Sequence, residues 1–129
     1  MTMQRRILPL LALPLAVPAL LGIAVPVSAH HSFAMFDKTH LVTVKGALNK
    51  LEWSNPHVYL FVTTAGADGV SKEYIVEAGS INILSRKGWK VNTVKVGDSI
   101  SVSFYPLKDG HPGGLLDSVT LPDGTVKKG

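Results

Sequence analysis

From residue 42 onward the chain is dominated by short segments in which apolar and polar positions alternate, which is typical of strands with one buried face. The clearest segment is 99–104, where Ile100, Val102 and Phe104 alternate with three serines. Clusters of Gly, Pro, Asn and Asp separate the segments and mark turns. The pattern predicts five strands, over residues 42–53, 57–64, 72–78, 99–104 and 115–121.

The first predicted strand is long and changes phase along its length. Its apolar positions have one parity at Val44 and the opposite parity at Leu51. A regular strand cannot keep both on one face, because successive side chains point to opposite sides. We therefore expect a bulge or bend between Gly46 and Lys50, where the glycine suits such a distortion.

The second predicted strand separates its side chains between two faces. One face carries Val58, Leu60 and Val62, and the other carries His57, Tyr59 and Phe61. Tyr59 and Phe61 are expected to fill the core or cover a barrel mouth, unless they form a binding face.

One short helix is predicted between the third and fourth strands. Ser80 is a suitable N-cap, Ile81 and Leu84 would face inward, and Gly88 would end the helix. Three strands, a small helix and two strands, with a long bent first strand, follow the order of an OB-type barrel. We predict an all-β fold of this kind: an OB-like five-stranded barrel with one short helix between strands three and four. An open β-sandwich is the alternative.

Residues 1–29 have the pattern of a cleavable secretory signal. Arg5 and Arg6 precede an uncharged apolar stretch over residues 7–27, and a V-S-A cleavage site ends at position 29. Four prolines in this stretch disfavour a stable membrane-spanning helix, so an uncleaved anchor is the weaker alternative. We therefore expect an exported protein, periplasmic or secreted, without a stable membrane anchor after cleavage.

The mature chain is expected to be a single domain over residues 30–129, beginning with an N-terminal arm over residues 30–40. The whole sequence has 13 Lys and Arg against 9 Asp and Glu, and the removal of Arg5 and Arg6 leaves 11 against 9. So small an excess of positive charge does not indicate a nucleic-acid partner. Together with export, it leads us to expect no nucleic acid among the partners.

The sequence contains no cysteine. This excludes disulfides, lipid attachment at a cysteine, covalent haem attachment and thiolate metal sites. Any metal would be held by histidine, carboxylate, the terminal amine or Met35, the methionine that remains after cleavage.

Two motifs carry a resemblance to a known family. They are A-H-H-S-F-A-M-F-D at positions 29–37 and E-W-S-N-P-H at positions 52–57. With them, the sequence resembles a family of small exported bacterial proteins catalogued as a domain of unknown function. The resemblance covers nearly all of the mature chain and implies export and a single domain, but no activity.

The two histidines behind the predicted cleavage site are the first candidates for chemistry. Cleavage after Ala29 would make His30 the first residue, and its free amine and imidazole together can chelate one metal ion. Copper is the expected metal, since the affinity order of divalent ions peaks at Cu(II) and imidazole suits it. The alternative is that His30 and His31 belong to a solvated arm, as residues near chain termini commonly do.

A further metal ligand is expected from His31 or His57. His31 can meet the same ion only if the arm bends, whereas His57 follows the turn that also holds Glu52. As accessory residues, Glu52 would accept a hydrogen bond from a ligand ring or bind directly, and Met35 would add a thioether for Cu(I). The alternatives are a His57 that is hydrogen-bonded to Glu52 or to the Asn55 turn, and a Met35 that only packs.

Two classes of non-enzymatic function follow. The first is copper binding or handling by an exported protein, with a metal ion and a periplasmic protein as partners. The second is an OB-type ligand or protein-interaction module without a metal, which would use Tyr59, Phe61 and Tyr74 to hold its ligand. His111 lies in a Gly-rich loop and is expected to be solvated, although the loop could swing over a site. An enzyme is the least favoured class, because no known catalytic motif is present.

Overall fold

The computed structural model describes residues 33–129, so the predicted signal segment, His30 and His31 lie outside the described residues. Along the chain the elements are η1 (Phe33–Met35), β1 (Val42–Glu52), β2 (Tyr59–Ala65), β3 (Ser71–Glu77), α1 (Ile81–Arg86), β4 (Ser99–Pro106), β5 (Gly113–Thr120) and β6 (Val126–Lys128). Within this part of the chain, no helix combines the length and the apolar character that a membrane span needs.

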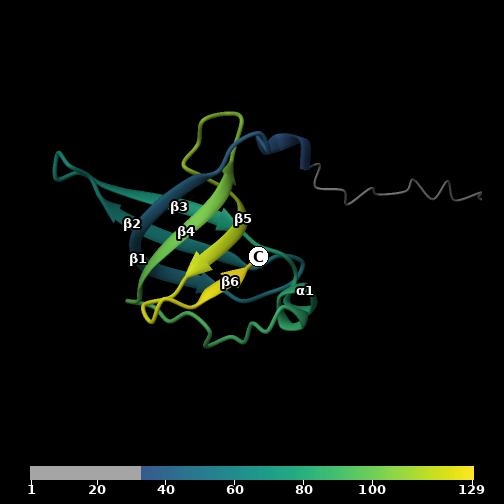
Figure 1. Ribbon diagram of the computed structural model, residues 1–129. Helices are drawn as coiled ribbons and strands as arrows, with labels where there is room; N and C mark the ends of the chain where they lie inside the picture. Colours follow the sequence, from purple (N-terminus) through teal and green to yellow (C-terminus); the bar gives the residue numbers. More distant parts are fainter. Residues whose placement is uncertain (1–32) are drawn as a thin grey trace, which may run out of the picture. The chain divides into compact units, whose positions relative to one another are not determined.

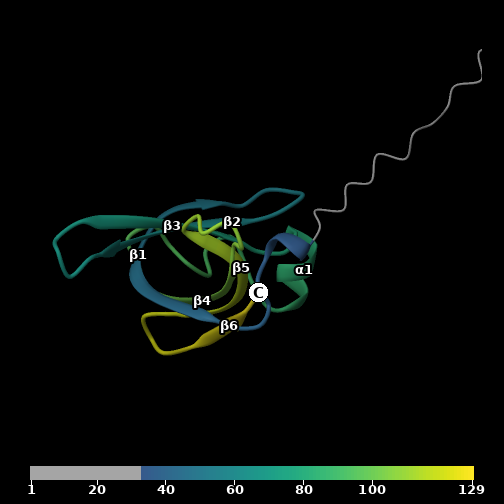
Figure 2. The same ribbon diagram turned by 90° about the horizontal axis from the view of Figure 1, so that it is seen from above.

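Strands β1 to β5 form a closed barrel. The sheet order is β3-β2-β1-β4-β5-β6, and an additional parallel pairing of β3 with β5 closes the ring (Figures 1 and 2). The predicted OB-like five-stranded barrel is therefore confirmed, with α1 between β3 and β4. One addition to the prediction is β6, a three-residue strand that pairs with β5 outside the ring.

The long first strand serves both sides of the barrel. Its first half pairs with β4 and its second half with β2, and the register with β2 shifts between Leu48 and Lys50. This confirms the bulge predicted from the change of phase. The bend lets one continuous strand keep apolar side chains inward at both ends, because it reverses the parity of the inward positions.

The barrel interior is filled by aliphatic side chains and two aromatic rings. On the predicted second strand, Val58, Leu60 and Val62 point inward and are fully buried, whereas Tyr59 and Phe61 lie on the other face. The three aliphatic side chains pack with Leu48, Val76, Ala78, Leu84, Trp89, Val94, Ile100, Val102, Phe104, Leu116 and Val119. No charged or polar side chain of the described residues is buried with them, so the core is held together mainly by apolar burial.

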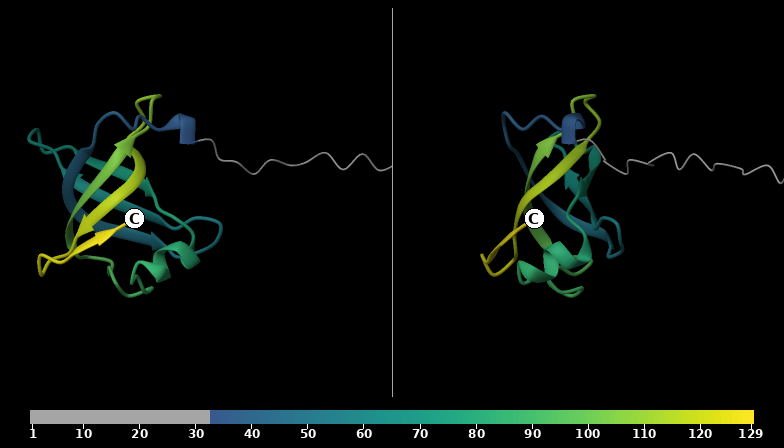
Figure 3. Two further views of the ribbon diagram at one scale, coloured as in Figure 1. Left: turned by 45° about the vertical axis from the view of Figure 1, so that its right-hand side comes forward. Right: turned by 90° about the vertical axis from the view of Figure 1, so that its right-hand side faces the viewer.

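The helix α1 covers one end of the barrel, and η1 lies with the β4–β5 loop at the other end (Figures 1 and 3). The Ser80 hydroxyl accepts a hydrogen bond from the Ile83 amide at 3.3 Å, which confirms the predicted N-cap. Leu84 is fully buried, and the Trp89 indole donates to the carbonyl of Lys128 at 2.7 Å. The helix end is therefore joined to β6 by a hydrogen bond as well as by packing.

The closure between β3 and β5 requires two glycines. Gly113 has φ +136°, and a Cβ at this position would lie 2.0 Å from the Ile75 carbonyl oxygen. A Cβ at Gly114 would lie 1.9 Å from the carbonyl oxygen of Tyr105. The sequence analysis began the fifth strand after these glycines, at residue 115. The structure begins β5 at Gly113, because only residues without a side chain can approach two neighbouring backbones so closely.

We expect Gly113→Ala to lower the free energy of unfolding by at least about 2 kcal/mol, because a disfavoured φ is combined with a backbone clash. Gly110→Ala is the matched control: Gly110 also has positive φ, at +83°, but nothing lies within 4 Å of its added Cβ. Its loss should be about 1 kcal/mol, from the φ alone. Urea unfolding followed by tryptophan fluorescence measures both. Equal losses would show that the close approach does not matter.

Candidate functional site

A row of polar side chains crosses the outer face of β1, β2 and β3. Glu52 lies opposite Tyr59, and Tyr59 lies opposite Glu77 in the registers of the two strand pairs. Residues directly opposite each other in a sheet share a face. Phe61 and Ile75, two positions further along their strands, are also paired and share this outer face. The outer face thus combines an acidic row with an apolar one.

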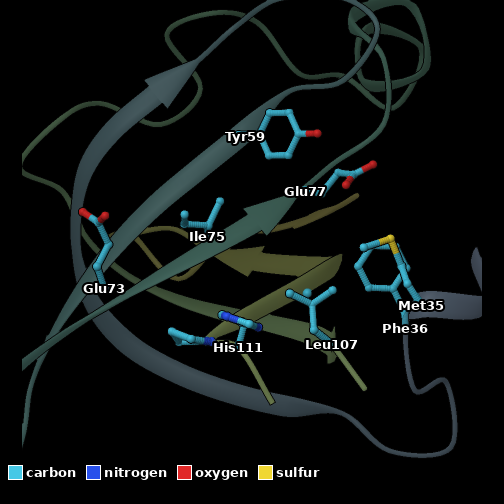
Figure 4. A pocket seen from close by; sticks show the side chains of 10 residues that line it. Met35, Phe36, Tyr59, Glu73, Ile75, Glu77, Leu107 and His111 are labelled. Carbon is cyan, nitrogen blue, oxygen red and sulfur yellow. The ribbon is translucent and has the colours of Figure 1, made fainter. Parts of the chain in front are cut away.

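A pocket of about 340 Å³ lies where this face meets the β4–β5 loop and the N-terminal arm (Figure 4). Its accessible wall is mostly apolar. The residues around it are Met35, Phe36, Tyr59, Glu73, Ile75, Glu77, Leu107, His111, Pro112 and Gly114. In Figure 4, Glu73 lies at one end of the pocket and Met35 and Phe36 lie at the other. The pocket therefore runs along β3.

The arm that forms one end of the pocket is attached to the β4–β5 region by backbone hydrogen bonds. The amide of Asp37 donates to the carbonyl of Pro106 at 2.8 Å, and the amide of Lys108 donates to the carbonyl of Met35 at 3.0 Å. Phe36 forms a bridge with Leu107 and is only 5% exposed. This part of the arm is therefore a fixed wall of the pocket. It lies far in the sequence from residues 106–108, to which it is bonded.

His57 pairs with a carboxylate other than the predicted one. Its Nδ1 lies 2.7 Å from Oε1 of Glu77, with both side chains largely buried. Glu52, the predicted partner, contacts the Lys50 ammonium at 2.5 Å instead. His57 precedes β2, and β3 brings Glu77 to the same end of the sheet, which the spacing of residues 52–57 along the chain does not show.

The described residues do not gather into a metal centre. Across residues 33–129, no group of three or more His, Cys, Asp or Glu side chains is placed to hold a metal ion. Nδ1 of His40 lies 3.2 Å from Oδ2 of Asp37, and Nδ1 of His111 lies 3.1 Å from Oδ2 of Asp109, so each of these histidines contacts a single carboxylate. The proposed ligands His30 and His31 lie outside the described residues, and the roles predicted for His57, Glu52 and Met35 as copper ligands or accessories stay predictions.

Two of the three aromatic residues expected to form a binding face do share one. Tyr59 and Phe61 are half-buried on the outer face, so part of each ring is still accessible to a ligand. Tyr74 lies opposite Val62 and packs toward the core, with its ring centroid 5.9 Å from that of Phe104. The expectation that Tyr74 joins Tyr59 and Phe61 in one binding face was wrong. The register gives Tyr74 the parity of an inward position, and at the partly exposed edge of the core its hydroxyl can still reach water.

Tyr59 has a perturbed hydroxyl. Burial raises the pKa of its phenol above the ordinary value, and the negative charge of Glu77, a hydrogen bond with that carboxylate and the charge of Glu52 raise the pKa further. All of these effects disfavour the phenolate. At neutral pH Tyr59 therefore keeps its proton.

The sequence analysis did not identify several of the residues that line the pocket. Glu73, Ile75 and Glu77 occupy alternate positions of β3, so strand periodicity could have placed them together on one face. Leu107 and Pro112 come from the ends of a loop, and no sequence signal assigns a loop to a particular strand face. His111, expected to be solvated, is largely exposed and also lines the pocket.

Comparison with known proteins identifies a family and a similar fold. Residues 18–117 match the sequence model described as "Family of unknown function (DUF6152)", which confirms the resemblance found in the motifs. No curated protein matches the sequence. The crystal structure of the mitochondrial single-stranded DNA-binding protein Rim1 from S. cerevisiae is similar, with a TM-score of 0.48 and 14% identity, covering 70% of this chain and 96% of that one.

The prediction that nucleic acid is not among the partners was wrong. It rested on a small net charge and on predicted export. The similar solved structure is that of a protein named for binding single-stranded DNA. A likeness of this size carries no ligand to the present chain, and the site must be interpreted from its own residues.

We expect Tyr59 to titrate above ~10, the ordinary tyrosine value, in a spectrophotometric titration in which Tyr59→Phe identifies its contribution. In Glu77→Gln the pKa should fall but remain raised, because burial persists. The raised pKa means that the folded chain holds this proton more tightly than the unfolded chain does. The free energy of unfolding should therefore decrease as pH rises past ~10, and by less in Tyr59→Phe. An unchanged titration in Glu77→Gln would contradict this.

Proposed function

We propose that this chain, which belongs to the DUF6152 family of unknown function, is a non-enzymatic binding module whose ligand occupies the pocket along β3. One observation carries the proposal: a pocket of about 340 Å³ with mostly apolar walls and a few polar side chains at its margins. Ligand sites commonly have this size and this composition.

Exposed apolar side chains in the pocket favour a ligand that covers them. Ile75 is 44% exposed and Met35 is 45% exposed, although both are large and apolar. Covering such surface is worth about 25 cal/mol per Å². The site also lies on the part of an OB barrel, the face of the second and third strands beside the loop between the fourth and fifth, that supports ligand binding in that architecture.

The walls of the pocket are fixed before a ligand arrives. One wall is a strand of a closed barrel, and the other is an arm held by backbone hydrogen bonds to residues 106 and 108. A pre-formed site loses little conformational entropy on binding. The polar groups nearest β2 contact one another, Glu77 with His57 and with Tyr59, which favours a role in shaping the site over catalysis.

Copper binding by an exported form is the second candidate, and the His57–Glu77 contact favours it. Histidines that bind metals commonly donate their other ring N–H to a carboxylate, which orients the ring. Nδ1 of His57 lies 2.7 Å from Oε1 of Glu77, so a carboxylate stands beside the ring nitrogen that such a bond would use. His30, as a mature N-terminal residue, would supply the chelate, with His31 or His57 completing the ligand set.

The pocket proposal predicts that 1-octanol, a neutral apolar probe, binds beside β3 and shifts the amide NMR signals of residues around Ile75. Ile75→Thr, which keeps a β-branched side chain, should weaken binding about threefold to tenfold through lost apolar contact. Met35→Gln alters the opposite wall at an exposed position and should weaken binding similarly.

Val96→Thr is the control for these variants, since Val96 is 68% exposed outside the pocket. Its affinity for 1-octanol should equal that of the wild type. The proposed pocket is wrong if 1-octanol shifts no signal there, or if all three variants bind it equally well.

The copper proposal predicts a specific intact mass for the protein exported by its own host. Native mass spectrometry should show residues 30–129, with one copper retained after one equivalent is added and none retained in His30→Ala. His57→Gln then tests the further ligand and should reduce retention. A different N-terminus, or equal retention by His30→Ala, would exclude the terminal chelate.

A further inference from the structure

The acidic end of the pocket indicates what the ligand carries. Three side chains around the pocket are ionisable carboxyl or imidazole groups: Glu73, Glu77 and His111. Glu77 contacts His57, and His111 contacts Asp109 at 3.1 Å. Glu73 receives a hydrogen bond from the neutral Asn49 amide at 2.9 Å, and no cation of residues 33–129 lies within ion-pair distance of it. Glu73 therefore places a carboxylate without a cation partner among the described residues at one end of the mostly apolar pocket.

The pocket is long enough to separate a charged group from an apolar body. Glu73, Ile75 and Glu77 follow one another on the same face of β3, and four residues of strand span about 13 Å. The apolar side chains Met35 and Phe36 lie at the end opposite Glu73 (Figure 4). Glu77 also lines the pocket, but it contacts His57, so among the described residues the carboxylate without a cation is at the Glu73 end. A ligand with a positive charge at that end and a hydrocarbon chain behind it matches this distribution.

The volume favours a small molecule. At about 30 Å³ per molecule of liquid water, a pocket of about 340 Å³ corresponds to about eleven water volumes. An alkyl chain with about eight carbons and one terminal group fills most of that space.

From these three features we infer that the ligand is an aliphatic primary amine, bound with its ammonium group at Glu73 and its chain along Ile75 toward Met35. This inference rests on the proposed function, because it names the ligand class for the same pocket. An ammonium gains charge-assisted hydrogen bonds with the Glu73 carboxylate, a modest gain because Glu73 is exposed. A carboxylic acid of the same length would bring a like charge to Glu73, and an alcohol would lack the ion pair.

The test compares three probes of equal chain length: 1-octylammonium, 1-octanol and octanoate. At pH 8 an alkylamine is protonated, as a lysine side chain is. Affinities come from amide NMR titrations of the whole chain. Octylammonium should bind about threefold to tenfold more tightly than octanol, and octanoate should bind more weakly than octanol.

Glu73→Gln should lower the affinity for octylammonium to that for octanol and leave octanol unchanged. Asp68→Asn is the matched control, because it removes the same charge from the same hairpin at a residue that does not line the pocket. Its affinities should equal those of the wild type.

The outcomes separate this inference from the proposed function. If octanol binds and Ile75→Thr weakens it, but octylammonium gains nothing or Glu73→Gln has no effect, the pocket stands and the amine is wrong. If Asp68→Asn weakens octylammonium as much as Glu73→Gln does, the preference is a general effect of charge and the inference is also overturned. If no probe shifts the pocket signals, both fail.

Discussion

The parallel pairing of β3 with β5 is the contact on which the rest of the structure depends. It turns an open sheet into a barrel, and it forms only because two consecutive glycines let the start of β5 approach the backbones at Ile75 and Tyr105. The same contact brings the β4–β5 loop beside β3. Without it the aliphatic core would have an open edge, and the pocket would lack the wall that carries Leu107 and Pro112. Stability and the candidate site therefore share one structural requirement.

The outer face of the barrel combines acidic residues with exposed apolar side chains. Glu73 and Glu77 line the pocket along β3, and within residues 33–129 the apolar side chains Ile75 and Met35 stay exposed there. Apolar side chains exposed in a concave site gain most from a ligand, because the ligand removes them from water while the walls stay in place. The free-energy gain comes mainly from the hydrocarbon, and in the proposed complex Glu73 decides which end of the ligand lies where.

The N-terminal arm links the pocket to the start of the chain. Met35 and Phe36 belong to the motif that first indicated the family, and the structure uses them as one end of the pocket. The motif therefore has a structural reason that is independent of metal binding: Phe36 anchors the arm by burial, and the backbone on both sides of it bonds to β4 and its loop. The histidines of the same motif stay a separate question, of which copper binding is one answer.

Sequence alone determined the order of the elements along the chain, the bulge in the first strand, the capped helix and the alternation of side chains between the two faces of the strands. Each of these follows from local periodicity or from a residue with a strong conformational preference, such as Ser80 or the glycines. Only the tertiary structure decided that Gly113 and Gly114 belong to a strand, that His57 pairs with Glu77 rather than Glu52, and that Tyr74 faces the core. These depend on which distant backbones meet when the barrel closes, and a chain pattern records the parity of a residue but not its neighbour across the sheet.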